Sequence, residues 1–306
     1  MSGRPSILIT GGGGYLGSML ARSLLDAGHD LHLADICFSD AALKEFPRYS
    51  QVYLHTLDLR DAVAVERLCR VAEPAHIFHL AAMIDRSRDP ALMAPMLEVN
   101  LGGTLNLLMG LKDIPYLSFG FSSTSEIYGN KNPLPFTEDM PPQPVSPYSL
   151  SKWMAEDLIR SWSGMLGKPW RVFRIFNFYG PGMPPQTFIP QLLESLERRT
   201  SFHMTPGAQR RDYLHVHDLL WYLREMVLGE MLQNEVINLC SGESVSMDEI
   251  ADKLTPREQD RALLHKDLPY RENEIWDIRG DASKLRTAFP HHRPRRIEEG
   301  LQGLVR

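Results

Sequence analysis

The first half of the chain alternates between short strand-like runs and longer segments with helical spacing. Runs at positions 7–9, 30–34 and 51–56 have the length and composition of buried strands. The segments at 15–25 and 62–71 carry apolar residues at the spacing of an amphipathic helix. This alternation predicts an α/β fold with a doubly wound, Rossmann-like parallel sheet. Further strands are predicted at 76–82, 116–121, 170–176 and 236–240, and further helices at 95–111, 148–162 and 189–199.

The regular alternation ends near residue 176. The proline-rich stretch 131–147 cannot form a helix, and the irregular GPGMPP segment at 180–185 marks the exit from a first lobe. We therefore predict two parts of unequal size. They are a first domain over 1–176 with a return segment at about 212–240, and a smaller C-terminal lobe over 177–211 and 241–306.

Glycines fill the turn between the first predicted strand and the first predicted helix. The stretch ILITGGGGYLG, Ile7 to Gly17, fits the dinucleotide-binding pattern Gly12-x-Gly14-x-x-Gly17 and a wider variant that begins at Gly11. Such a turn lets the backbone approach a pyrophosphate, to which the helix N-terminus offers free N–H groups. A P-loop is excluded because no Lys precedes Ser18. The predicted contacts are Gly11, Gly14, Tyr15, Leu16 and Gly17.

An aspartate at the end of the second predicted strand supports a dinucleotide site. Asp35 lies about 20 residues beyond the glycines, where an acidic side chain binds the ribose hydroxyls of adenosine. The nearest following basic residue is Lys44, so no cation stands ready for a 2′-phosphate. The sequence therefore predicts NAD rather than NADP, held in the first domain.

The third predicted strand ends at a second candidate for the adenosine site. Asp58 either bonds the adenine amino group, with Leu59 against the ring, or caps the helix predicted at 62–71. The sequence leaves both interpretations open.

Small residues close the fourth predicted strand. Leu80, Ala81 and Ala82 are expected where backbone passes close to a cofactor, whereas His79 is expected to be a core histidine. Asn100 lies inside a predicted helix, where Asn is a poor helix former. Its side chain either reaches back to the strand ends near the active site or is simply a tolerated polar residue.

Composition excludes several classes of function. The net charge of −5 argues against nucleic acid or an anionic membrane as the main partner. Cys37, Cys69 and Cys240 are widely spaced, which indicates buried thiols in a reducing compartment rather than disulfides or a zinc site. No N-terminal segment joins a basic start to a long apolar run, so we expect a cytoplasmic protein without a membrane span.

A phenol and an ammonium lie four positions apart at the start of a predicted helix. Tyr148 and Lys152 therefore project from one helix face. A neighbouring cation favours the phenolate and is expected to lower the pKa of Tyr148 from about 10 toward the working pH. Such a tyrosine can remove a proton from a hydroxyl while hydride leaves the carbon for NAD⁺.

Two further side chains end the fifth predicted strand. Thr124 can bond the reacting oxygen, or it belongs to a Ser/Thr-rich turn that caps itself. Glu126 can act on a second carbon of the substrate, or it is a solvated or paired turn residue.

These motifs together resemble the extended short-chain dehydrogenase/reductase family, and specifically its nucleotide-sugar epimerases and dehydratases. The resemblance covers nearly the whole chain. Its segments are TGGGGYLG (10–17), HLAA (79–82), VNLGGTLNLL (99–108), SSTSEIYG (122–129), PYSLSK (147–152), RIFNFYGPG (174–182) and QRRDYLHVHD (209–218).

The resemblance implies roles for residues that spacing alone leaves open. Residues matching Thr124, Tyr148 and Lys152 oxidise the sugar at C4 in that family, and those matching Asn177 and Arg211 contact the nucleotide diphosphate. NAD usually stays bound through the reaction. The family uses no metal, so His215 and His217, which alternate on a strand-like stretch, are not expected to bind one.

Departures from the family pattern bear on the type of reaction. Typical 4,6-dehydratases carry Thr-Asp-Glu, but this chain has Thr124-Ser125-Glu126 and so lacks the acid. That triplet resembles the UDP-glucuronate decarboxylases, which usually carry a basic RRxPD segment near the C-terminus. Here RENEIWDIRGDASK (271–284) is closer to the epimerase pattern, with Trp276 at a customary arginine position. Arg279 is then a candidate for the phosphate or substrate contact.

The favoured interpretation is an NAD-dependent 4-epimerase whose smaller lobe closes over a nucleotide-diphosphate sugar. The alternatives are a dehydratase or a UDP-glucuronate-type decarboxylase that uses Glu126, and a one-way C4 dehydrogenase or 4-ketoreductase. An NAD-sensing regulator is the non-enzymatic alternative, which the intact Thr–Tyr–Lys set argues against. The family also pairs the helices predicted at 95–111 and 148–162 in a four-helix bundle, which implies a homodimer.

Overall fold

The computed structural model describes residues 5–270 and 274–304. The chain divides into two compact units. The first unit comprises residues up to Ile127, Pro142–Arg174 and Leu220–Ile237, and the second comprises Tyr128–Pro141, Ile175–Leu219 and Asn238 onward. The proline-rich loop is thus split between the units, and the segment that returns to the first unit begins at Leu220.

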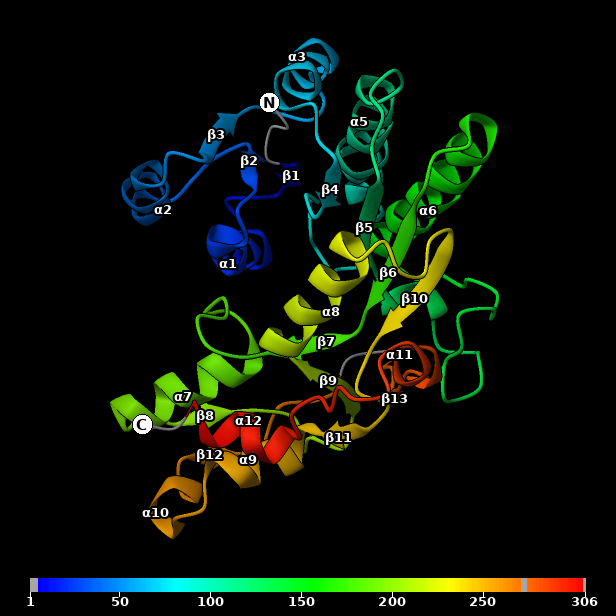
Figure 1. The fold of residues 1–306 in the computed structure, drawn as a ribbon. Coiled ribbons are helices and arrows are strands. Elements are labelled where there is room, and N and C mark those ends of the chain that lie inside the picture. Colours follow the sequence, from blue (N-terminus) through cyan, green and yellow to red (C-terminus); the bar gives the residue numbers. More distant parts are fainter. Residues whose placement is uncertain (1–4, 271–273, 305–306) are drawn as a thin grey trace. The chain divides into compact units, whose positions relative to one another are not determined.

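A seven-stranded sheet of order β10-β6-β5-β4-β1-β2-β3 organises the first unit (Figure 1). Strands β1 to β5 pair in parallel, which agrees with the α/β fold and the doubly wound sheet that the sequence predicts. The strand order reverses between β1 and β4, and ligands of such sheets bind outside the carboxyl ends of the strands at that point. The strands are β1 (Ser6–Thr10), β2 (Asp30–Asp35), β3 (Val52–Thr56), β4 (His76–His79), β5 (Ser118–Thr124), β6 (Arg171–Ile175) and β10 (Glu235–Leu239).

Helices pack on this sheet through an apolar core. Leu8, Ile77, Phe119 and Val172 come from four strands of the sheet, and all are fully buried in one cluster with side chains of α3, α5 and α6. The helices of this unit are α1 (Tyr15–Leu24), α2 (Asp40–Glu45), α3 (Ala62–Ala72), α4 (Met93–Met96), α5 (Gly103–Gly110) and α6 (Pro147–Leu166). Helix α8 (Val216–Leu228) begins in the second unit and ends in the first, and short 3₁₀ turns cover Leu25–Ala27, Phe46–Arg48, Pro90–Leu92 and Ser125–Tyr128.

The helix predicted at 95–111 is interrupted by a π-helical turn. That turn, η4 (Leu97–Gly102), separates α4 from α5 and contains Asn100. The Asn100 carbonyl accepts the hydroxyl of Thr104 at 2.5 Å, and its side chain is bonded outside the helix. π-Turns inside helices are frequent at functional sites.

A small sheet and a separate core form the second unit. Strand β9 (Arg210–His215) lies between β11 (Ser244–Ser246) and β13 (Asp277–Ile278) and also pairs with β7 (Asn177–Tyr179). Tyr179, Ile189, Leu192 and Ile250 are buried in its apolar cluster. The remaining elements are β8 (Phe202–His203), β12 (Leu264–His265), α7 (Phe188–Arg198), α9 (Met247–Leu254), α10 (Glu258–Arg261), α11 (Ser283–Ala288) and α12 (Ile297–Gln302). Among the described residues, no helix combines the length and apolar character needed to cross a bilayer.

Candidate active site

The glycine turn after β1 leaves no room for side chains. Gly11 has a φ of +73°, and a Cβ there would lie 2.7 Å from the backbone nitrogen of Ala81. A Cβ at Gly17 would overlap the carbonyl oxygen of Gly11, and one at Gly13 would overlap that of Cys37. Helix α1 starts at Tyr15 after Gly14, which provides no side-chain cap for the first N–H groups. The turn and helix start therefore have the backbone geometry of a pyrophosphate cradle.

Asp35 lies directly beside this turn. Its Oδ2 accepts the Gly13 N–H at 3.0 Å, and its Oδ1 accepts the Ile36 N–H at 2.7 Å. The carboxylate is thus fixed at the carboxyl end of β2, next to the glycines. Residues 36–43 contain no Lys or Arg. The Asp35 carboxylate can accept hydrogen bonds from the two ribose hydroxyls of NAD, and the stretch that follows it carries no cation for a 2′-phosphate.

Asp58 does not cap the helix that follows it. Asp61 caps α3 by accepting from the backbone nitrogens of Val63 and Ala64. Asp58 instead forms an ion pair with Arg60 at 2.6 Å, so the capping alternative is wrong. The adenine contact of Asp58 remains a prediction. Leu59, its predicted partner, is buried under α5, where a Cβ at Gly103 would lie 2.9 Å from the Leu59 Cβ.

His79 is buried between the side chains of Thr10 and Thr104. Its Nδ1 lies 2.7 Å from the hydroxyl of Thr10, and its Nε2 lies 2.9 Å from the hydroxyl of Thr104. Burial lowers the pKa of His79 to about 3, with the Lys152 charge acting in the same direction. His79 is therefore a neutral, satisfied core histidine, as its sequence context indicates. The Thr10 hydroxyl also accepts the N–H of Ala81, which fixes the half-buried segment of Leu80, Ala81 and Ala82 beside Gly11.

Asn100 reaches back from the π-turn to the end of the sheet. Its Oδ1 accepts the Met83 N–H at 2.7 Å, and its Nδ2 donates to the Met83 carbonyl and to the hydroxyl of Ser151. The Asn100 side chain thus reaches back to the strand ends, which is the first of the two alternatives that the sequence leaves open. Asn100 connects the segment after β4 to α6, one residue before Lys152. Its contact with the cofactor remains a prediction.

The structure brings three of the predicted catalytic side chains to one place in the first unit. Thr124 ends β5, and Tyr148 and Lys152 lie in the first two turns of α6. All three are buried, and Tyr148 is hydrogen-bonded to the Thr124 side chain. Helix α6 starts here because Ser146 and Ser149 form a reciprocal capping box with Pro147 at the first helical position.

Burial is the largest influence on the pKa values of Tyr148 and Lys152. It raises the pKa of Tyr148 to about 12, and the charge of Glu126 adds to this. Arg86 and the Thr124 hydrogen bond act in the opposite direction. The expected net lowering of the phenol pKa by Lys152 is therefore wrong for this structure. Burial also lowers the pKa of Lys152 to about 7, against the attraction of Glu156.

Sequence reasoning missed two charged residues near the site, Arg86 and Glu156. Arg86, in the loop after β4, contacts Glu126 with 3.1 Å between Nε and Oε1. Glu156 lies one helical turn beyond Lys152 and forms a buried ion pair with Arg174. The spacing Tyr148, Lys152, Glu156 on one helix face was the available signal for Glu156.

The predicted substrate residues of the second unit lie on or near its small sheet. Asn177 begins β7 and is in register with Tyr213 of β9. Arg211 of β9 donates to Glu274 at 2.7 Å and to the carbonyl of Ile275. The Nε of Arg279 is buried and has no hydrogen-bond partner within the described part of the chain. Residues 271–273, which begin the segment RENEIWDIRGDASK, lie outside the described residues.

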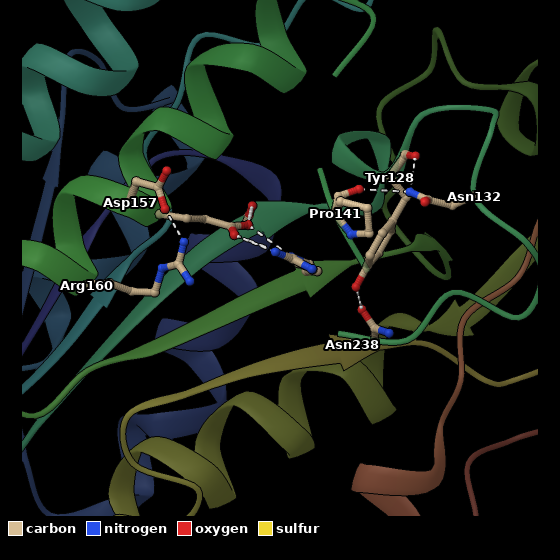
Figure 2. A network of polar contacts seen from close by, with 9 residues as sticks. Tyr128, Asn132, Pro141, Asp157, Arg160 and Asn238 are labelled. Carbon is tan, nitrogen blue, oxygen red and sulfur yellow. Dashed lines mark hydrogen bonds and ion pairs between the residues drawn. The ribbon is translucent and has the colours of Figure 1, made fainter. Parts of the chain in front are cut away.

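A polar network fixes the loop that follows Tyr128 in the same unit (Figure 2). The Nδ2 of Asn132 donates to the carbonyls of Tyr128 and Pro141. The hydroxyl of Tyr128 donates to Asn238 at 2.6 Å, and the Asn238 amide donates to the carbonyl of Phe136. These bonds hold the part of the proline-rich loop that belongs to the second unit, residues 131–141, in a defined conformation.

Comparison with known proteins decides the family. A model of the NAD dependent epimerase/dehydratase family matches residues 7–240. The chain belongs to this family. A putative UDP-glucose 4-epimerase of Methanocaldococcus jannaschii is 27% identical over 287 residues, which cover 91% of this chain and 90% of that protein. A dTDP-glucose 4,6-dehydratase of Shigella flexneri is 34% identical over 239 residues, which cover 69% of this chain and 65% of that protein.

Solved structures of the same family have the same fold. A UDP-glucose 4-epimerase of Thermotoga maritima, solved with UDP-glucose, superposes with a TM-score of 0.81 at 25% identity, covering 97% of this chain and 96% of that chain. The predicted family, fold and NAD cofactor are thus confirmed. The relatives include epimerases, dehydratases and a GDP-6-deoxy-D-talose 4-dehydrogenase, so the comparisons do not distinguish these reactions.

Gly17→Ala should weaken NAD binding at least ~10-fold, because the new methyl group displaces the turn that receives the pyrophosphate. Isothermal titration with NAD measures this effect. Gly164→Ala in α6 is the matched control, since a Cβ there meets no atom within 4 Å. Equal NAD affinity of Gly17→Ala and the control would contradict the placement of the cofactor.

Proposed function

We propose that this protein is a nucleotide-sugar 4-epimerase that works through transient oxidation at C4 of the sugar. The observation that carries the proposal is the buried group of Thr124, Tyr148 and Lys152 in the unit that contains the glycine turn. Such a group positions a base, a hydrogen-bonding hydroxyl and a cation around one reacting alcohol.

Each of these side chains has a separate task in the proposed reaction. The Thr124 hydroxyl holds the C4 oxygen of the sugar, and Tyr148 takes the proton of that oxygen. Lys152 stabilises the phenolate that this step requires, because a phenol whose pKa is raised by burial needs nearby positive charge. NAD, held at the glycine turn and Asp35, would accept the hydride of C4 and return it to the opposite face of the keto sugar. Tyr148 would give the proton back to the C4 oxygen, which would leave C4 inverted.

The nucleotide part of the substrate is proposed to bind through residues of the second unit. Asn177, Arg211 and Arg279 are the proposed contacts for the diphosphate and the sugar. Arg211 already binds a carboxylate, that of Glu274, so its guanidinium is oriented for oxygen anions. The Arg279 Nε supplies a further buried donor. The first unit is correspondingly proposed as the NAD-binding domain and the second as the substrate-binding domain.

The surroundings of Glu126 favour epimerisation over elimination. A 4,6-dehydratase needs an acid for the C6 hydroxyl, and the position before Glu126 is a buried serine, Ser125. The Glu126 carboxylate itself is engaged in an ion pair with Arg86. Epimerisation at C4 needs neither group.

A lyase is the second candidate, because Glu126 lies close enough to Tyr148 to influence its ionisation. In this candidate, Glu126 removes the C5 proton during dehydration or assists a UDP-glucuronate-type decarboxylation. One-way oxidation or ketoreduction at C4 would use the same Thr124, Tyr148 and Lys152. An NAD sensor has no use for this set of three.

We also propose that the chain forms a homodimer through α5 and α6. Leu105 and Met109 project from one face of α5 and are exposed, as are Met154 and Met165 on one face of α6. Pairing these two helices with their mates would cover the apolar side chains in a four-helix bundle.

A panel of UDP-, GDP-, CDP- and dTDP-sugars tests the activity. Mass spectrometry and NMR should show one sugar converted to an isomer of unchanged mass. Tyr148→Phe should lose at least ~100-fold in turnover and keep its NAD affinity, because it lacks only the proton acceptor. Loss of water or carbon dioxide would identify a lyase, and a fully active Tyr148→Phe would contradict the assigned base.

Glu126→Gln separates epimerase from lyase. Because the Glu126 charge raises the pKa of Tyr148, its removal should move the acidic limb of the pH–rate profile to lower pH. Turnover at pH 7 should therefore persist. In D₂O, the wild-type product should carry no deuterium at C5. Loss of turnover in Glu126→Gln together with deuterium at C5 in the wild-type product would favour the lyase.

Sedimentation equilibrium tests the dimer. The wild type should sediment at twice the chain mass of 34.8 kDa, and Met109→Asp should shift it toward the monomer because a charge in an apolar interface is costly. Val63→Asp on α3, where the side chain is also exposed, should remain dimeric. A monomeric wild type would refute this proposal.

A further inference from the structure

A carboxylate without solvent exposure lies one helical turn beyond Lys152 on α6. The Glu156 side chain is 0% exposed, and that of Arg174, its ion-pair partner on β6, is 3% exposed. The Arg174 Nη2 lies 3.0 Å from Oε2 of Glu156, and its Nε lies 3.3 Å from each carboxylate oxygen. The hydroxyl of Ser123 on β5 donates to Oε1 of the same carboxylate. Glu156 therefore connects α6 to two neighbouring strands.

The next position of the same helix carries an ordinary surface ion pair. Figure 2 labels Asp157 and Arg160, whose side chains are 48% and 42% exposed. The two pairs thus differ in burial and partners although they start from adjacent residues of α6. This makes the surface pair a matched control for the buried one.

Stability alone gives no reason to bury Glu156 and Arg174. Taking two charges out of water costs about as much as their attraction returns, and apolar residues of equal volume often do as well. What the buried carboxylate does provide is a fixed negative charge one helical turn from Lys152. It also holds the hydroxyl of Ser123, the residue directly before Thr124.

Lys152 has few groups that favour its charge. It is 1% exposed, and its Nζ lies 4.2 Å from the ring centre of Phe121 on β5. From β4 it faces the neutral His79, and on its own helix it faces Tyr148 and Glu156. The charge of Arg174 on β6 is balanced by its ion pair with Glu156. Glu156 is the group that raises the pKa of Lys152 against the effect of burial.

We propose that Glu156 is a positioning residue for the C4 chemistry, which keeps the Lys152 ammonium charged and fixes the strand end that carries Thr124. The inference rests on the proposed function for its catalytic meaning. Glu156 touches neither the sugar nor NAD in this account and acts through Lys152 and Ser123.

The test removes the buried charges as a pair, because removing one would leave the other unpaired in the core. Glu156→Gln combined with Arg174→Met keeps an amide oxygen for the Ser123 hydroxyl and fills the arginine volume. A second variant, Glu156→Gln with Arg174→Gln, keeps an amide–amide hydrogen bond in case the first does not fold. The control is Asp157→Asn with Arg160→Met, which removes the surface pair.

The first readout is the charge of Lys152 itself, followed in holoenzyme labelled with ¹³C-lysine. The Cε resonance of Lys152 is assigned by its absence in Lys152→Met. Its titration midpoint should fall by about one pH unit or more in the core variants and stay unchanged in the control. An unchanged midpoint in folded core variants would overturn the inference.

The second readout is the pH dependence of sugar turnover. The alkaline limb of kcat should move to lower pH in the core variants, with KM for the nucleotide sugar unchanged, because Lys152 loses its proton earlier. Restoring the carboxylate as Glu156→Asp beside the native Arg174 should return the limb toward its wild-type position. A uniform loss at all pH values would show a merely structural role. If wild type converts no nucleotide sugar, the proposed function fails, and the Lys152 titration still decides whether Glu156 holds its charge.

Discussion

The close approach of backbone to backbone at the glycine turn is the constraint on which the site depends. Gly11 must accept a positive φ against Ala81, and Gly17 must lie on the carbonyl of Gly11. Only then can α1 start at the carboxyl end of β1, where the strand order of the sheet reverses. Asp35 is bonded to the same turn, so the proposed dinucleotide site is assembled from main chain and one carboxylate.

Burial also determines how readily the polar groups of the site ionise. The same desolvation that makes the Tyr148 phenol reluctant to ionise makes the Lys152 ammonium reluctant to stay charged. Each therefore needs partners, and the structure supplies Arg86 near the phenol and Glu156 near the ammonium. The ionisation of the proposed catalytic pair, Tyr148 and Lys152, thus depends on burial and on a few nearby charges, which proteins commonly use to tune reactive groups.

Local patterns in the sequence were sufficient to predict the positions of the strand–turn–helix unit, of Asp35 beside it and of the Tyr148–Lys152 pair on one helix. Each of these depends on spacing along the chain. Contacts between distant segments could not be predicted in this way: Glu156 and Arg174 are 18 residues apart, and Arg86 meets Glu126 from another loop. The sign of the Tyr148 pKa shift was missed because a sequence does not report how deeply a phenol is buried. Asp58 was a possible cap on spacing alone, but Asp61 has the required backbone geometry.

In the proposed reaction, the hydride of sugar C4 leaves and returns within one active site with Tyr148 as the base. A nucleotide sugar deuterated at C4 follows this hydride. The product should have inverted configuration and keep its deuterium at C4, as read by NMR. Deuterium at C6, or its loss to solvent, would show that the proposed reaction is wrong.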